Sequence, residues 1–190
     1  MRIAQMTLVG LFTIMLSACA GPMPMERAIR AADGRTYDAL LERIPGATPK
    51  QAFLRWRASQ RGLAYEEVVA RDEVLTRNPF TVRDENAVSF GALIYGNQCL
   101  SCHGVEAAGD GPSALPAFPP HNFRAFGARA AIALNGGPSD GWFETVLHGS
   151  GERVDYAAGR SRAMPAFDRK LSREQIWMVL TYLATSAAPE

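Results

Sequence analysis

Most of the apolar positions along the chain recur at helical spacing. Residues three or four positions apart form apolar stripes within 36–77, from 86 to 98 and from 176 to 184. Two long stretches, 104–126 and 149–170, carry little periodicity and are predicted to be loops. No segment shows the alternation of apolar and polar residues that is typical of a half-buried strand. The pattern therefore predicts an all-α fold with long loops.

Capping residues give the predicted helices their ends. Thr48 and Pro49 suit the N-cap and first position of a helix that Gly62 would stop. Ser172 and Gln175 form a capping box, in which each side chain can bond to the other's exposed backbone amide. Two shorter helices are predicted over 127–134 and 140–148, the second with Ser139 or Asp140 as its cap.

The first residues have the pattern of an export signal. A short positive start, Met1-Arg2, precedes the nearly uncharged apolar run 3–18, which is too short for a comfortable membrane span. The run ends in Leu16-Ser17-Ala18-Cys19, which resembles the lipobox of bacterial lipoproteins. That resemblance implies that Cys19 is acylated and becomes the mature N-terminus. Ordinary cleavage and an uncleaved anchor are the alternatives.

Acylation at Cys19 would decide where the protein resides. Several acyl chains on one residue hold a protein stably at a membrane surface, whereas one chain binds only marginally. Residue 20 is alanine rather than aspartate, which by resemblance to Gram-negative lipoproteins permits sorting to the outer membrane. We therefore expect the protein on the periplasmic side of a bacterial membrane, with the outer membrane favoured.

Four segments follow from these patterns. Residues 1–18 are the predicted lipoprotein signal peptide, and 19–35, with their prolines and glycines, are the acylated N-terminus and tether. Residues 36–87 are a helical extension of two or three short helices that packs onto the main domain, 88–190. The 20 cationic and 19 anionic residues give a net charge of +1. Nothing in that balance favours nucleic acid as a partner.

The segment QCLSCHG, residues 98–104, carries the clearest chemistry. A redox dithiol is expected at a helix start after a strand, whereas these cysteines follow a helix. A zinc site needs further ligands, and only His121 and His148 remain, at irregular spacing. The pattern Cys-x-x-Cys-His is that of c-type haem attachment. Cys99 and Cys102 would bond the two vinyl groups of one haem c, and His103 would be an axial ligand of the iron.

Residues 88–186 resemble a class I cytochrome c of the short bacterial monohaem type. The resemblance rests on motifs that occur in the family's order. They are Gly91-x-x-Ile94-Tyr95 before Cys99-x-x-Cys102-His103-Gly104, then Gly109-Asp110-Gly111-Pro112, Met164-Pro165-x-Phe167, and the helix from Leu171-Ser172 to Leu183. It implies the cytochrome c fold, in which loops wrap the haem and the terminal helices cross. Gly91 would then meet Tyr182, and the Pro112 carbonyl would hold the second ring nitrogen of His103.

Met164 is the predicted sixth ligand. It is an apolar thioether between polar flanks in a loop, and Pro165 stiffens the backbone behind it. Met178 lies in an apolar helix and is interpreted as core. His121 is a further candidate for the iron or a haem propionate, or a plain surface residue. Met23 and Met25 lie in the tether, and His148 is interpreted as structural at a helix end. Separately from the ligand, Trp142 and Phe143 are expected to pack on the haem, with packing in the core as the alternative.

Histidine and methionine together leave no open coordination position on the iron. We therefore expect an electron-transfer protein rather than an enzyme, with redox proteins as partners, no small-molecule substrate and a membrane contact through lipid. The protein would carry single electrons alone or as a subunit of a larger complex, with 36–77 as a docking element. The alternative is a haem sensor or haem enzyme from which Met164 dissociates.

A surplus of positive charge lies between Ser150 and Arg173. Six cationic residues stand against three anionic ones in this stretch, a net charge of +3. Such charges steer an acidic redox partner, or they solvate a loop and hold the haem propionates. The two interpretations are left open by the sequence. Charge reversal at Arg160 and Arg162 would separate them.

Overall fold

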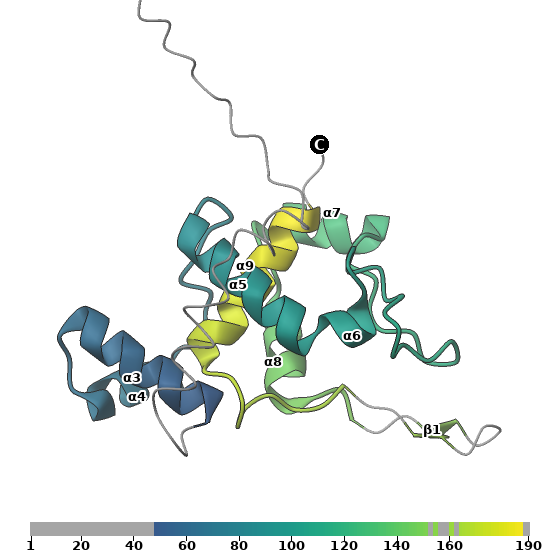
Figure 1. Ribbon diagram of the computed structural model, residues 1–190. Coiled ribbons are helices and arrows are strands. Elements are labelled where there is room, and N and C mark those ends of the chain that lie inside the picture. The colour runs from purple at the N-terminus through teal and green to yellow at the C-terminus, as the bar shows by residue number, and fades with distance from the viewer. Residues whose placement is uncertain (1–47, 152–153, 156–159, 162–163, 188–190) are drawn as a thin grey trace, which may run out of the picture.

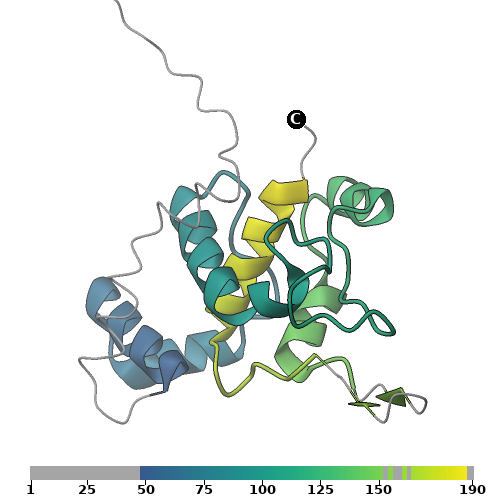
Figure 2. The ribbon, with the colours of Figure 1, turned by 45° about the vertical axis from the view of Figure 1, so that its right-hand side comes forward.

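The computed structural model describes residues 48–151, 154–155, 160–161 and 164–187. Expectations for the signal peptide, Cys19, the tether and the first part of the extension concern residues outside these ranges. The described part is helical, and its two largest elements are α5 (Glu85–Gln98) and α9 (Arg173–Ala187). Figures 1 and 2 show these two helices crossing at the centre of the molecule. The all-α fold of a cytochrome c is thus confirmed.

The crossing of α5 and α9 depends on Gly91. A Cβ atom at this position would collide with the carbonyl oxygen of Met178 and lie 2.8 Å from the Cβ of Tyr182. The ring of Tyr182 packs against that of Tyr95, with 5.5 Å between centroids. The predicted meeting of Gly91 and Tyr182 is therefore confirmed, and the two helix backbones touch because no side chain separates them.

Three shorter helices complete the main domain. The turn α6 (Leu100–His103) follows α5 almost directly, while α7 (Phe126–Asn135) and α8 (Asp140–His148) come after the long loop. The predicted bounds of α8 are confirmed, with Ser139 accepting from the amide of Trp142. α7 is one residue longer at each end than predicted, since its start has no side-chain cap to mark it.

One element was not predicted from the sequence. β1 (Val154–Asp155) and β2 (Arg160–Ser161) pair antiparallel, with Val154 opposite Ser161. Strands of two residues are too short to show an alternating pattern. The pair lies in the segment predicted to be loop and leaves the fold class unchanged.

The helical extension packs onto the main domain, as expected. It contains α3 (Pro49–Arg61) and α4 (Tyr65–Glu73). Thr48 caps α3 through a complete capping box with Gln51, and Gly62 ends it in the left-handed conformation. Phe53 and Leu54 of α3 and Val68 of α4 are buried in one cluster with Met178 of α9. The interpretation of Met178 as a core residue is confirmed.

Among the residues that the structure describes, no helix combines the length and the apolar character needed to cross a bilayer.

The α5–α9 contact gives a first prediction. Gly91→Ala should lower the free energy of unfolding of the holoprotein by about 1–3 kcal/mol, because the added methyl group forces the two helix backbones apart. Chemical denaturation followed by circular dichroism measures this difference.

Gly127→Ala is the matched control. Gly127 also lies in a helix, and a Cβ there would have no neighbour within 4 Å. This control should leave stability unchanged or raise it slightly. Equal stabilities for the two variants would contradict the importance of the close crossing.

Candidate functional site

A cavity of about 590 Å³ lies between the helices and the long loops. Its size falls in the range of about 300–1,000 Å³ that small-molecule and cofactor sites occupy. Four predicted site residues line it: Cys99, Cys102, His103 and Met164. These come from two segments about sixty residues apart in the sequence, and the fold brings them to one cavity. The rest of the lining is mainly apolar, with Leu115, Phe118, Phe123, Trp142, Val146, Phe167, Val179, Leu180 and Leu183.

The two cysteines are placed by consecutive helical turns. Cys99 ends α5, and the amides of Cys102 and His103 both bond to its carbonyl, at 3.1 and 2.9 Å. The following loop packs directly on this turn, since the Gly111 amide donates to the Cys102 carbonyl at 3.1 Å. A Cβ at Gly111 would lie 2.5 Å from the carbonyl oxygen of Ser101. Glycine is therefore required there for the loop to reach the back of the cysteine turn.

The cysteine pair does not have the properties of a redox dithiol. Desolvation by burial, with a smaller contribution from the neighbouring Cys102, raises the pKa of the Cys99 thiol to about 12. Reactive dithiols depend instead on a lowered thiol pKa. The ligands of a zinc site are also lacking in the described ranges, where no three His, Cys, Asp or Glu side chains are grouped to hold a metal ion.

His103 is held with its ring partly buried. Burial lowers its pKa, so the imidazole is neutral at neutral pH, which is the form that binds metals. Its Nδ1 atom is buried without a hydrogen-bond partner. The structure therefore has no hydrogen bond from this atom to the Pro112 carbonyl, and Pro112, which is exposed, does not line the cavity. The role of Pro112 stays a prediction.

A buried tyrosine fixes the backbone just after His103. The hydroxyl of Tyr95 donates to the carbonyl of Gly104 at 2.6 Å, inside the core. Burial raises the pKa of Tyr95 well above its ordinary value, with smaller contributions from Cys99, Tyr182 and Asp110. The hydroxyl thus stays a hydrogen-bond donor. The backbone around His103 is therefore held by two contacts, one from the Cys99 carbonyl and one from the Tyr95 hydroxyl of α5.

Met164 is anchored by the segment that follows α8. Its amide donates to the Ser150 hydroxyl at 2.9 Å, and the Ser150 amide donates to the Met164 carbonyl at 3.2 Å. The side chain is half-buried and packs against the main core. This arrangement gives a physical reason for an apolar thioether between polar neighbours.

Aromatic rings connect the cavity to the surface at His121. The ring of Phe123 lies 5.8 Å from that of His103, 4.8 Å from His121 and 5.0 Å from Trp142, between centroids. Phe123 is buried, whereas His121 is exposed and its pKa is lowered by burial of part of its ring. Trp142 and His121 both line the cavity, as the sequence allowed.

The structure decides the predictions made for Phe143 and His148. Phe143 does not line the cavity; its ring stacks on Trp177 at 4.3 Å inside the core. Core packing, the alternative for Phe143, is therefore correct. His148 is exposed at the end of α8 and its Nε2 lies 3.2 Å from Glu144 of the same helix, in agreement with a structural role.

The basic stretch is described only in part. Arg153 and Arg162 lie outside the described residues, as does the side chain of Arg160. Arg169 is exposed, and the Arg173 guanidinium lies over the Phe143 ring at 5.6 Å. Lys170 lines the cavity and lies over the Phe167 ring. Steering of an acidic partner by this stretch stays a prediction.

The residues present fit a haem. The apolar lining suits a macrocycle, two thiols lie one turn apart at the wall, and the buried, unpartnered Nδ1 of His103 belongs to a ring that lines the same cavity. Phe123 and Ser150 were not found from the sequence. Both lie in loops without periodicity, so no pattern marks which of their residues point inward.

Comparison with known families agrees with this site. Residues 86–183, more than half of the chain, match the family described as cytochrome C oxidase, cbb3-type, subunit III. The chain belongs to this family. Neither the comparison with curated proteins nor that with solved structures returned a match.

Membership of the cbb3-type subunit III family establishes the cofactor and the general role. The protein is a c-type cytochrome with covalently bound haem c, and it transfers electrons with redox partners. The match begins at residue 86, the second residue of α5, so α3 and α4 of the extension lie outside it.

Proposed function

We propose that this protein is a membrane-anchored monohaem cytochrome c that passes single electrons between respiratory or periplasmic redox partners. Cys99 and Cys102 carry the thioether bonds, and His103 and Met164 are the axial ligands. The observation that carries the proposal is the convergence of these four residues on one apolar cavity. The acylated Cys19 anchors the chain on the periplasmic side of a bacterial membrane, with the outer membrane favoured.

The protein's own residues prepare the site for electron transfer. When bound, the haem iron takes up and releases one electron. His103 is neutral because burial lowers its pKa, so it offers a lone pair without first losing a proton. Met164 is presented by two hydrogen bonds to Ser150. A thioether ligand together with an apolar wall favours the ferrous state and raises the reduction potential.

Closed ligation distinguishes this role from that of a haem sensor or enzyme. The fixed backbone at Met164 supports a ligand that stays in place and leaves no position for a substrate. The family's description names an oxidase subunit, which supports assembly into a larger complex, with the extension available as a docking element.

Covalent haem is the first test of the proposal. Extraction of the denatured protein with acidified organic solvent should leave one haem per chain on the polypeptide, because thioether bonds survive it. A C99S/C102S double variant should release its haem and lose its helical fold, since the cavity would be empty. Haem that is extractable from the parent protein would refute the attachment at both cysteines.

The sixth ligand is tested by Met164→Ala. The variant should keep its haem but lose the far-red sulfur-to-iron band of the ferric protein. Its reduction potential should fall, and its ferrous form should bind carbon monoxide rapidly. Met178→Leu is the matched control, because Met178 is buried between α9 and the extension. An unchanged band in Met164→Ala would assign the ligand elsewhere, with His121 next to be examined.

The anchor is tested by Cys19→Ser in the producing bacterium. Labelled fatty acid should enter the parent protein and not the variant, whose precursor should remain uncleaved at this position. Fractionation of the parent should recover it with the outer membrane. Equal labelling of parent and variant would show that acylation at Cys19 does not occur.

A further inference from the structure

The methionine loop, residues 164–171, is held at its first half by α8. The Phe167 amide donates to the carbonyls of Val146 and Leu147 at 3.1 and 3.2 Å, and the Asp168 amide donates to Leu147 at 3.2 Å. Together with Ser150, these contacts fix the loop to the last turn of α8. They come from inside the region that matches the family.

The second half of the loop is held from outside that region. Lys50, near the start of α3, donates from its Nζ to the carbonyl of Asp168 at 2.9 Å. A smaller hollow of about 240 Å³ is lined by Pro49 together with Gln98, Lys170 and Leu171. Gln98 and Lys170 also line the main cavity. The start of α3 therefore reaches the rim of the main cavity.

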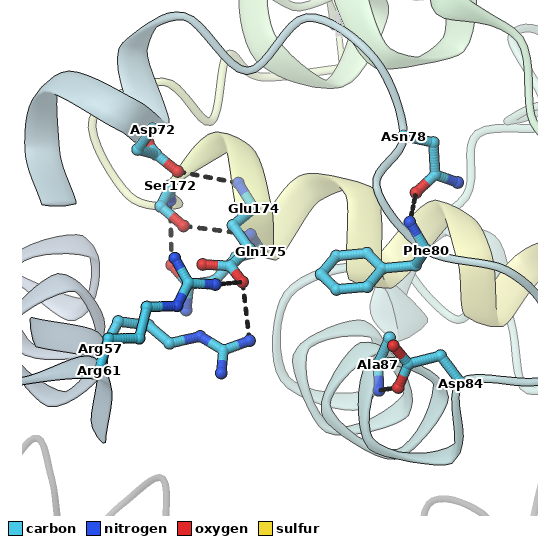
Figure 3. Close-up of polar contacts among 10 residues, drawn as sticks. All are labelled: Arg57, Arg61, Asp72, Asn78, Phe80, Asp84, Ala87, Ser172, Glu174 and Gln175. Carbon is cyan, nitrogen blue, oxygen red and sulfur yellow. Dashed lines mark hydrogen bonds and ion pairs between the residues drawn. The ribbon is translucent and has the colours of Figure 1, made fainter.

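Asp72, in α4, fixes the point where the loop becomes α9. Its Oδ2 accepts from the Arg173 amide at 3.0 Å and its Oδ1 from the Glu174 amide at 2.9 Å. The Ser172 hydroxyl accepts from the Gln175 amide, and the Ser172 amide donates to Oε1 of Gln175, which confirms the predicted capping box. Figure 3 shows the contact of Asp72 with the Glu174 amide and the Ser172–Gln175 box.

The first amides of α9 are hydrogen-bonded partly by α4 and partly by the helix's own N-cap residue. A helix leaves its first amides without partners inside the helix. Here two are bonded by a carboxylate from another segment, and a third by the N-cap serine. Asp72 is only 5% exposed, so its bonds are little screened by water. Its negative charge also faces the positive end of the helix dipole.

An ionic contact also joins α3 to the start of α9. Arg57 and Arg61 of α3 donate to one carboxylate oxygen of Glu174, at 2.7 and 3.0 Å. The Glu174 side chain is 8% exposed. Side chains of both α3 and α4 thus bind the first turn of α9.

We propose that the helical extension is a clamp on the methionine loop, with Lys50 and Asp72 as positioning residues that limit the release of Met164 from the iron. The inference rests on the proposed role of Met164 as an axial ligand. By holding the end of the loop and the start of α9, the extension raises the free energy needed to open the methionine loop. This gives a function to a segment outside the family match.

The test measures how often the loop opens. Ferric full-length protein is mixed with increasing imidazole, and the limiting rate of ligand exchange reports the departure of Met164. Asp72→Ala should raise this rate roughly fivefold to tenfold, because the stability that is usually lost with a helix cap corresponds to about this factor in the opening of the loop. Lys50→Met should raise it about twofold to fivefold, the usual effect of losing one hydrogen bond.

Arg71→Ala is the matched control. Arg71 precedes Asp72 in α4 and pairs with Glu67 on the exposed face of the same helix. Its loss should leave the limiting rate unchanged. Rates for Asp72→Ala and Lys50→Met that equal that of Arg71→Ala would overturn the clamp. If Asp72→Ala does not fold, the Lys50→Met rate decides.

Hydrogen exchange separates the clamp from the ligand assignment. Amides in a peptide covering 164–175 should exchange faster in Asp72→Ala than in Arg71→Ala, whatever ligand the iron has. A parent protein without the sulfur-to-iron band would refute Met164 as a ligand, whereas equal exchange in the two variants would refute the clamp.

Discussion

The direct contact of α5 with α9 at Gly91 is the constraint on which the rest of the structure depends. Because no side chain separates the two backbones, α5 and α9 lie close enough to share a core of Tyr95, Tyr182 and their neighbours. The end of α5 then delivers Cys99 to the cavity, while Val179, Leu180 and Leu183 of α9 form part of the facing apolar wall. The position of Cys99 at the cavity thus depends in part on the close approach that Gly91 allows.

The cavity itself depends on loops more than on helices. The long stretch between α6 and α7 has little apolar periodicity, yet it contributes Leu115, Phe118 and Phe123 to the lining. Backbone hydrogen bonds tie it to the cysteine turn, including one from the Ser113 amide to the Ser101 carbonyl at 2.7 Å. A covalently bound haem gives these loops a large apolar group to pack on, in addition to the buried core of the helices.

The extension adds contacts to the methionine loop and to the start of α9. In the part that matches the family, the methionine loop is joined to α8 and runs directly into α9. The buried carboxylate of Asp72 and the Arg57–Arg61–Glu174 contact add a second set of attachments from α3 and α4 (Figure 3). Breaking a buried contact of this kind leaves a charge without its partner, which is costly. An additional segment therefore holds the end of the loop that carries Met164 without touching Met164 itself.

The sequence by itself determined the elements and the chemistry that are local along the chain. Thr48, Gly62, Ser139 and the Ser172–Gln175 box define helix ends because capping acts over three or four residues. Cys99, Cys102 and His103 indicated haem because two thiols and a histidine on adjacent turns need no tertiary contact to be recognised. The family match agrees with that interpretation.

Only the tertiary structure decided which distant residues meet. Phe143 and Trp142 are neighbours in sequence, yet one is core and the other lines the cavity, because successive residues of a helix point in different directions. Phe123 and Ser150 lie in loops, where no period predicts orientation. In the sequence, Asp72 stands in a charged stretch and no local pattern marks it as a helix cap. Its role as a cap on α9 arises across about a hundred residues of sequence, through a contact that only the packing of α4 on α9 creates.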